Sequence, residues 1–269
     1  MIKRLFFILL CLLQLTPSAQ AEKRKRGQAI IQQSYQEPDP LMPPAPPADA
    51  LVRQPEIGQQ RHRHTTGKRG IDVSHYQNQI NWNAVAEDKD VTYAYIKATE
   101  HAGLVDKMFY TNLREAKRAG IPVGCYHFFS PTAAPQAQLK NLTSAVPHLK
   151  DHDLIPMIDV EVKGKNTSAE DLRHRLRQFL KGVEDYYGIK PLIYTGQNFY
   201  NNFLAGYFED YLFMIAKYSE GTPELIGNPK FAMWQYSASG RVKGIKGAVD
   251  RSCFMDNYGL RDILIKKKK

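Results

Sequence analysis

The residues that invite a chemical interpretation are two acids in a short apolar run. Asp159 and Glu161 lie within Ile-Pro-Met-Ile-Asp-Val-Glu-Val, residues 155–162. If this run is a strand, alternation places both carboxyl groups on one face, ~6.6 Å apart along the strand axis. Two like charges so close raise the pKa of one group, so that one carboxyl stays protonated while the other is ionised. This is the arrangement of a glycosidase.

An Asp-x-Glu pair on a strand is also compatible with a purely structural, salt-bridged role. Three further acids at predicted strand ends favour a functional cluster, because burying ionised carboxylates without partners is costly. These acids are Asp72, Glu100 and Asp250. Aromatic side chains whose apolar faces can stack on sugar rings occur at or near the same strand ends: Tyr76, Tyr126, Tyr194, Tyr218, Trp234 and Tyr236.

Short apolar runs alternate with amphipathic segments from residue 70 onward. Eight runs are strand candidates, at residues 71–74, 92–99, 122–129, 155–162, 191–195, 213–218, 232–236 and 249–254. Helical periodicity occurs at residues 109–119, 134–146 and 172–186, whereas the spacers 219–231 and 238–248 are too short or too Gly-rich for full helices. The pattern predicts an α/β fold, a single (β/α) barrel, TIM-like with degenerate helices in its second half. No Gly-x-Gly-x-x-Gly follows a predicted strand, which argues against a dinucleotide fold.

Charge is distributed unevenly along the 269 residues, whose formal net charge is +10. Residues 71–260 hold twenty-one basic and twenty-one acidic side chains, so the whole excess lies in the terminal segments. A protein that binds nucleic acid would need a basic face on its folded part, and none is expected. The basic segments at either end leave two interpretations open, electrostatic contact with an anionic envelope or simple solvation.

Four segments are expected. Residues 1–21 resemble a secretory signal peptide, with Lys3 and Arg4, an apolar run, and Ala-Gln-Ala at residues 19–21. Residues 22–69 are basic and Pro-rich and predict a disordered linker, residues 70–260 the barrel, and residues 261–269 a basic C-terminal tail. No later run is apolar enough to span a membrane, so we expect a secreted or periplasmic protein.

Cysteine and histidine usage restricts the remaining chemistry. After removal of a signal peptide only Cys125 and Cys253 remain, either as one disulfide or as two buried thiols. His62 and His64 lack further ligands for a metal, and no metal or cofactor is expected.

Eight ordered blocks resemble glycoside hydrolase family 25, the Chalaropsis-type lysozymes, which are N-acetylmuramidases. The blocks are Gly-Ile-Asp-Val-Ser-His-Tyr-Gln (70–77), Ile-Asn-Trp (80–82), Ile-Lys-Ala-Thr-Glu (96–100), Pro-Val-Gly-Cys-Tyr-His-Phe-Phe (122–129), Pro-Met-Ile-Asp-Val-Glu (156–161), Pro-Leu-Ile-Tyr (191–194), Trp-Gln-Tyr (234–236) and Val-Asp (249–250). The resemblance covers nearly the whole predicted barrel, and its substrate would be the glycan strands of peptidoglycan.

The resemblance implies roles for individual residues. Glu161 would be the acid/base that protonates the oxygen between N-acetylmuramic acid and N-acetylglucosamine, and Asp159 would orient the substrate's 2-acetamido group as it attacks the anomeric carbon. Substrate contacts would come from Asp72, Asp250, Tyr126, Trp234, Tyr194, Glu100 and Gln235. Departures from the family pattern at Asn78, His101, Arg251 and Ser252 affect the shape of the substrate loops and remove none of the acids.

Two rival hypotheses remain. A chitinase-like hydrolase also uses an Asp-x-Glu strand, but its longer Asp-Gly-x-Asp-x-Asp-x-Glu signature is absent, because residues 153–158 are Asp-Leu-Ile-Pro-Met-Ile. A catalytically silent wall-binding module would not need all four of Asp72, Asp159, Glu161 and Asp250.

Overall fold

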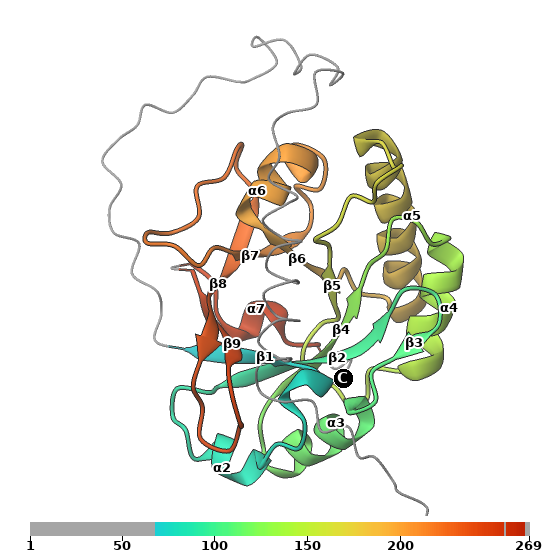
Figure 1. Cartoon of the computed structure of the whole chain (residues 1–269). Coiled ribbons are helices and arrows are strands. Elements are labelled where there is room, and N and C mark those ends of the chain that lie inside the picture. The colour runs from blue at the N-terminus through green and yellow to red at the C-terminus, as the bar shows by residue number, and fades with distance from the viewer. Residues whose placement is uncertain (1–67, 256, 267–269) are drawn as a thin grey trace, which may run out of the picture. The chain divides into compact units, whose positions relative to one another are not determined.

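The computed structural model describes residues 68–255 and 257–266 (Figure 1). The expected signal peptide and nearly all of the expected linker lie outside these residues. Within the described part, no helix is long and apolar enough to cross a membrane.

A closed sheet of eight strands forms the centre of the structure. The strands are β1 (Arg69–Val73), β2 (Tyr93–Glu100), β4 (Val123–Phe128), β5 (Met157–Asp159), β6 (Leu192–Gly196), β7 (Leu212–Ala216), β8 (Lys230–Gly240) and β9 (Val249–Phe254). Each of the eight predicted runs contributes one strand. The order around the sheet is β1-β9-β8-β7-β6-β5-β4-β2, and pairing of β1 with β2 closes it. A two-residue strand, β3 (Leu104–Val105), extends the end of β2 as a hairpin.

The prediction of a TIM-like (β/α) barrel is wrong. The barrel is mixed, because β9 runs antiparallel to both of its neighbours, β1 and β8. Only eight residues separate β8 from β9, and Gly244 and Gly247 have positive φ angles of 92° and 95°. A parallel connection needs a crossover of a dozen residues or more, whereas this length with two left-handed glycines suits a hairpin.

Helices cover only part of the barrel wall. The three predicted helices are confirmed as α3 (Phe109–Arg118), α4 (Pro135–Ala145) and α5 (Ala169–Tyr187). The other helical segments are short: η1 (His75–Gln77), α2 (Trp82–Ala86), α6 (Gln197–Phe199), the π-helical η2 (Tyr200–Leu204) and α7 (Leu260–Ile263). No helix connects β7 to β8, because Gly221, Pro223, Gly227 and Pro229 interrupt that segment.

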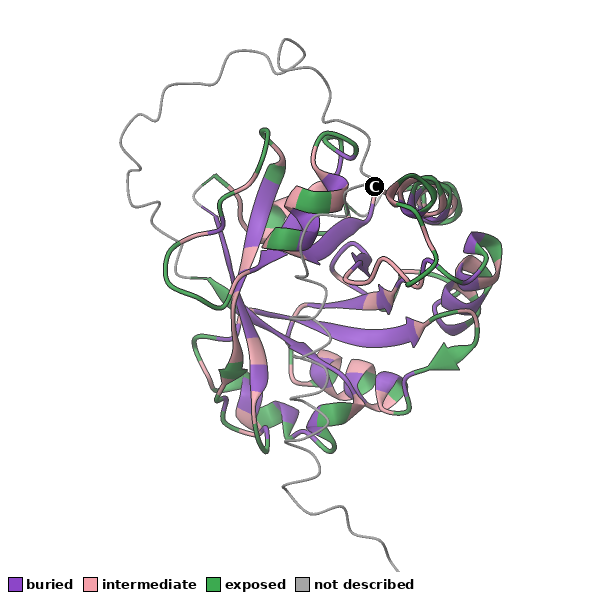
Figure 2. Cartoon of the chain, turned by 45° about the horizontal axis from the view of Figure 1, so that its top comes forward, coloured by how far each residue is buried: buried purple, intermediate pink, exposed green. Residues whose placement is uncertain are grey.

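Alternation along the strands divides the buried side chains into two apolar clusters. The outer cluster fills the space between the barrel wall and the helices and includes Ile71, Ile96 and Ile158. The inner cluster lies inside the barrel and includes Tyr95, Met157 and Phe254. Figure 2 shows strands that are buried along most of their length and helices whose outer faces are exposed.

The C-terminal segment packs against the barrel instead of projecting from it. Ile263 is fully buried in the inner cluster, and Leu264 forms a β-bridge with Leu154, just before β5. Residues 261–265 of the expected basic tail therefore belong to the folded unit, and Ile263 covers the end of the barrel where the parallel strands begin.

The two cysteines of the folded part are buried free thiols. Cys125 belongs to the outer cluster, and burial raises its pKa to about 12. The disulfide that the sequence left open is not formed, and both residues act as small apolar side chains.

Gly124 permits the close packing of the inner cluster. A Cβ atom at this position would lie 2.6 Å from the Tyr95 ring and 2.9 Å from Leu154 Cβ. We therefore expect Gly124→Ala to lower the free energy of unfolding by ~1–3 kcal/mol through overpacking, measured by urea denaturation. Gly103→Ala is the matched control, since its Cβ would meet nothing within 4 Å. Equal stability of the two variants would contradict this packing.

Candidate active site

Four acids that the sequence singled out come together at the end of the barrel where the parallel strands end. Asp72 and Asp159 alternate with outer-cluster residues such as Ile71 and Ile158, so their side chains face the interior. Asp72 lies opposite Asp250 in the register of β1 and β9. We call the set Asp72, Asp159, Glu161 and Asp250 the acidic cluster.

Glu161 lies two residues beyond β5, which is shorter than the predicted strand. Backbone pairing with β6 continues for one more residue after the strand, because Val160 N–H donates to the Tyr194 carbonyl at 2.9 Å. Asp159 is therefore fixed by the sheet, whereas Glu161 belongs to the following loop and is half-buried.

The electrostatics of Asp159 are set mainly by burial. Desolvation raises the pKa of this carboxyl well above its ordinary value, and the charge of Glu161 raises it further, while the Lys97 ammonium opposes the shift. Asp159 Oδ1 is buried and has no hydrogen-bond partner in the described part of the chain. A buried acceptor without a partner can accept a hydrogen bond from a donor group of a bound ligand.

The Glu161 carboxyl has a pKa close to neutral pH. Burial raises the pKa of its carboxyl to about 7, Asp250 adds to the rise, and the Tyr194 hydroxyl and the Lys97 ammonium lower it. A carboxyl with this pKa gives and takes protons near pH 7, as a general acid/base must.

A polar network holds Asp72. Gln235 Nε2 donates to Asp72 Oδ2 at 2.9 Å, while Gln235 Oε1 accepts from the hydroxyls of Tyr194 (2.8 Å) and Tyr218 (2.5 Å). The two hydroxyl donors fix the orientation of the amide, so its NH₂ group must face the carboxyl. Burial nonetheless raises the pKa of Asp72 to about 8, aided by the charge of Asp250, and Asp72 Oδ1 has no partner among the described residues.

Glu100 pairs with a cation in the structure. Its Oε2 lies 2.6 Å from Lys97 Nζ, and its side chain is partly exposed. Lys97 lies 5.2 Å from the centre of the Phe128 ring and is itself buried. Because Glu100 also contributes to the raised pKa of Asp159, it lies at the edge of the acidic cluster.

The structure brings some of the predicted aromatic side chains to the cluster. Burial and the charges of Asp159, Asp250 and Asp72 raise the pKa of Tyr126, and Tyr194 belongs to the network of Gln235. Trp234 is placed differently: it packs against the outer cluster, and its Nε1 donates to the Lys217 carbonyl at 3.0 Å.

Two residues near the cluster were missed by sequence reasoning. His75 Nδ1 lies 2.6 Å from Asp106 Oδ2, and the same oxygen accepts from His75 N–H at 3.1 Å. Asp106 is buried, and its charge contributes to the raised pKa of Tyr126, which places the pair beside the acidic cluster. His75 follows Asp72 within one motif, but Asp106 lies in a loop that no periodicity marks.

The site combines raised carboxyl pKa values with unpartnered acceptor atoms and partly exposed tyrosines. Among the described residues, no group of three or more His, Cys, Asp or Glu side chains is arranged to hold a metal ion. The chemistry that these side chains can perform is proton transfer to and from a polar, hydroxyl-rich ligand.

Comparisons with known proteins agree with this chemistry. The sequence profile described as "Glycosyl hydrolases family 25" matches residues 71–245. Among relatives, YegX of Escherichia coli O157:H7 is 41% identical over 189 residues, covering 69% of this chain and 68% of the relative. Lysozyme M1 of Streptomyces globisporus is 33% identical over 202 residues, covering 71% and 68%. The crystal structure of the bacterial lysozyme from Streptomyces coelicolor superimposes with a TM-score of 0.65 at 32% identity, covering 71% of this chain and 93% of that one.

The raised pKa of Asp72 should be visible in the pH dependence of stability. The folded carboxyl has a pKa of about 8, against ~3.9 when unfolded. Between these values the folded state binds the extra proton, so stability falls as pH rises, by up to ~1.4 kcal/mol per pH unit from this group. Asp72→Asn should reduce the loss of unfolding free energy between pH 5 and pH 7.5, measured by urea titrations at several pH values.

The control for this measurement is Asp151→Asn, which replaces an exposed aspartate. It should follow the wild-type pH profile. An Asp72→Asn variant with the same pH slope as wild type would mean that Asp72 is ionised in the folded protein.

Proposed function

Because this chain belongs to the glycosyl hydrolases of family 25 and is a peptidoglycan hydrolase of the lysozyme type, we propose that its acidic cluster cleaves the β-1,4 bond between N-acetylmuramic acid and N-acetylglucosamine. The observation that carries this assignment is one buried, unpartnered carboxyl oxygen, Asp159 Oδ1, beside a carboxyl of pKa about 7, that of Glu161.

Glu161 is the acid/base of the proposed reaction. At neutral pH about half of its carboxyl groups carry the proton that the glycosidic oxygen needs. Transfer of that proton releases N-acetylglucosamine with a free 4-hydroxyl and leaves Glu161 as a carboxylate. The nearby Lys97 ammonium lowers the pKa of Glu161 and so favours the carboxylate after transfer.

Asp159 assists the substrate's own nucleophile. The carbonyl oxygen of the 2-acetamido group attacks the anomeric carbon as the glycosidic bond breaks, and the acetamido N–H then becomes strongly acidic in an oxazolinium ring. Asp159 Oδ1, buried and unpartnered, accepts a hydrogen bond from this N–H. The interaction strengthens as positive charge develops, so it stabilises the transition state more than the bound substrate.

Water completes the reaction. The Glu161 carboxylate takes a proton from a water molecule, which attacks the anomeric carbon and reopens the ring. The sugar keeps its configuration because two displacements occur at the same carbon, and Glu161 recovers its proton. Substrate assistance is a recognised exception to the two-carboxylate scheme of glycosidases.

The other predicted residues are proposed to hold the sugar. Asp72, kept in place by Gln235, and Asp250 offer acceptors for hydroxyl or amide groups. Tyr126 and Tyr194 are proposed to line the sugar site near Asp159. Glu100, at the edge of the cluster, and Trp234, which packs against the outer cluster, are also proposed to contact the substrate.

Peptidoglycan lies outside the cytoplasmic membrane, which agrees with the expected signal peptide at residues 1–21. We propose export to the periplasm or the exterior, with the basic linker and C-terminal residues in electrostatic contact with an anionic envelope.

Glu161→Gln should lower turnover on peptidoglycan by ~10²–10⁴, the usual size of general acid/base catalysis, with an unchanged fold. The wild-type kcat/KM should fall as pH rises above about 7, because the acid loses its proton, and the residual activity of the variant should lack this decline. Mass spectrometry of wall digests identifies the new reducing ends, which should be those of muramic acid.

Glu170→Gln on the exposed surface of α5 is the control and should behave as wild type. Near-normal turnover of Glu161→Gln would remove this residue from the role of acid/base.

Asp159→Asn should impair turnover more than binding, since Asp159 acts on the developing intermediate. Turnover is measured on glycan strands in the Asp159→Asn single variant. Affinity is measured by calorimetry, comparing Glu161→Gln with the double variant Glu161→Gln/Asp159→Asn so that no substrate is consumed. Unchanged turnover combined with weaker binding would refute the assignment and leave Asp159 as a substrate-binding group.

A further inference from the structure

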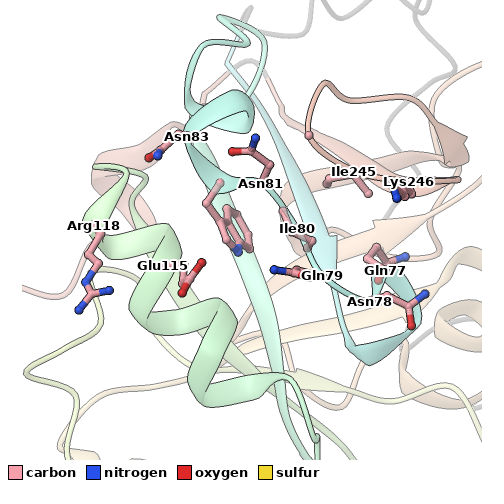
Figure 3. A pocket seen from close by; sticks show the side chains of 12 residues that line it. Gln77, Asn78, Gln79, Ile80, Asn81, Asn83, Glu115, Arg118, Ile245 and Lys246 are labelled. Atoms are coloured by element: carbon pink, nitrogen blue, oxygen red, sulfur yellow. The ribbon is translucent and has the colours of Figure 1, made fainter.

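A concave site lies outside the acidic cluster. A cavity of about 820 Å³ opens between η1, α2, α3 and the loop that joins β8 to β9 (Figure 3). Its volume is within the range of ligand pockets in proteins. None of the groups assigned to the reaction lines it.

Carboxamide side chains dominate the lining of this cavity. Asn78, Gln79, Asn81 and Asn83 are all exposed there. Asn81 Oδ1 caps α2 by accepting from Ala84 N–H at 3.1 Å, and among the described residues no side-chain hydrogen bond engages Gln79 or Asn83. A carboxamide both donates and accepts, so this set matches the N–H and C=O groups of another amide chain.

Charges of both signs complete the lining. Arg118 and Lys246 lie on opposite sides of the cavity in Figure 3, and Glu115 lies one turn before Arg118 on α3. Within residues 68–255 and 257–266 no ion pair includes Arg118 or Lys246, whereas Glu115 contacts the exposed Arg114 at 3.4 Å. Two unpaired cations can therefore bind carboxylates, and Glu115 can bind an ammonium group.

Gln77 connects the cavity to two segments that carry acids of the cluster. Gln77 lines it, accepts from Ser74 N–H at 2.9 Å and donates to the Ala248 carbonyl at 3.2 Å. Ser74 and Ala248 are each two residues from an acid of the cluster, Asp72 and Asp250 respectively. A ligand that occupies the cavity therefore sits against the same two segments that present these acids to the glycan.

We propose that this cavity binds the peptide stem of peptidoglycan, a short amide chain that carries carboxylates and, where it is not cross-linked, an ammonium group. A bare glycan fits less well, because stacking on a sugar ring requires an exposed aromatic face, and the indole that lines the cavity, Trp82, is only 3% exposed. The inference rests on the proposed function in one respect, namely that peptidoglycan is the substrate.

The test uses the full chain and a free stem tetrapeptide without sugar, titrated by calorimetry at low salt. Arg118→Glu/Lys246→Glu should weaken peptide binding at least tenfold. On peptide-bearing strands the KM should rise by a comparable factor with kcat little changed. On glycan strands stripped of peptide, the variant should act as wild type. Lys140→Glu/Lys150→Glu changes the same charge at two exposed lysines outside the cavity and should leave all these values unchanged.

Three outcomes would overturn the proposal: no binding of the peptide by wild type, equal affinity in the cavity variant, or an equal loss of activity on stripped and peptide-bearing strands. Failure of the proposed mechanism would give a different set of results. Glu161→Gln would then keep its turnover on stripped strands, while peptide binding would respond to Arg118→Glu/Lys246→Glu as expected.

Discussion

The acidic cluster depends on the direction of a single strand, β9. Asp250 is the second residue of β9, so in a parallel strand it would lie at the end of the barrel where the other strands begin. Because β9 is antiparallel to β1 and β8, its first residues lie where the parallel strands end, and Asp250 comes opposite Asp72. The hairpin between β8 and β9 thus completes the cluster, and its left-handed glycines, Gly244 and Gly247, are the local cause.

Closure of the sheet also creates the environment that shifts the pKa values. Beneath the acids, Tyr93 and Tyr95 fill the barrel, with the Tyr93 hydroxyl 2.9 Å from Ser252 Oγ and its ring 5.1 Å from that of Phe254. Ile263 seals the far end. Carboxyl groups above such a layer lose hydration on one side, and desolvation is accordingly the largest cause of the raised pKa of Asp72, Asp159 and Glu161.

Local pattern in the sequence predicted much of this structure, and the failures have a common physical origin. Each apolar run became a strand and each amphipathic segment a helix, because those periods depend on neighbouring residues only. The direction of β9 depends on pairing with β1, almost 180 residues away, and strand periodicity is the same in either direction.

The same limit applies to individual side chains of the site. Register shifts where β8 pairs with β7 and β9, and Ala232 and Met233 both join the inner cluster, so simple alternation fails on this strand. The alternation of residue types along β8 therefore could not show that Gln235 faces Asp72 while Trp234 packs outward. The contact of His75 with Asp106 joins two loops and likewise has no periodic signal.

Lys97 offsets part of the negative charge of the acids in this site. It is buried and pairs with Glu100 at the edge of the cluster, and its charge lowers the pKa of both Asp159 and Glu161. One ammonium cannot balance the four carboxylates of the acidic cluster in a poorly hydrated space, so protons must supply the remaining neutralisation near pH 7. A retained proton on the cluster is the reagent that cleavage of a glycosidic bond requires, and we therefore propose that the excess of acids over cations supplies the acid of the reaction.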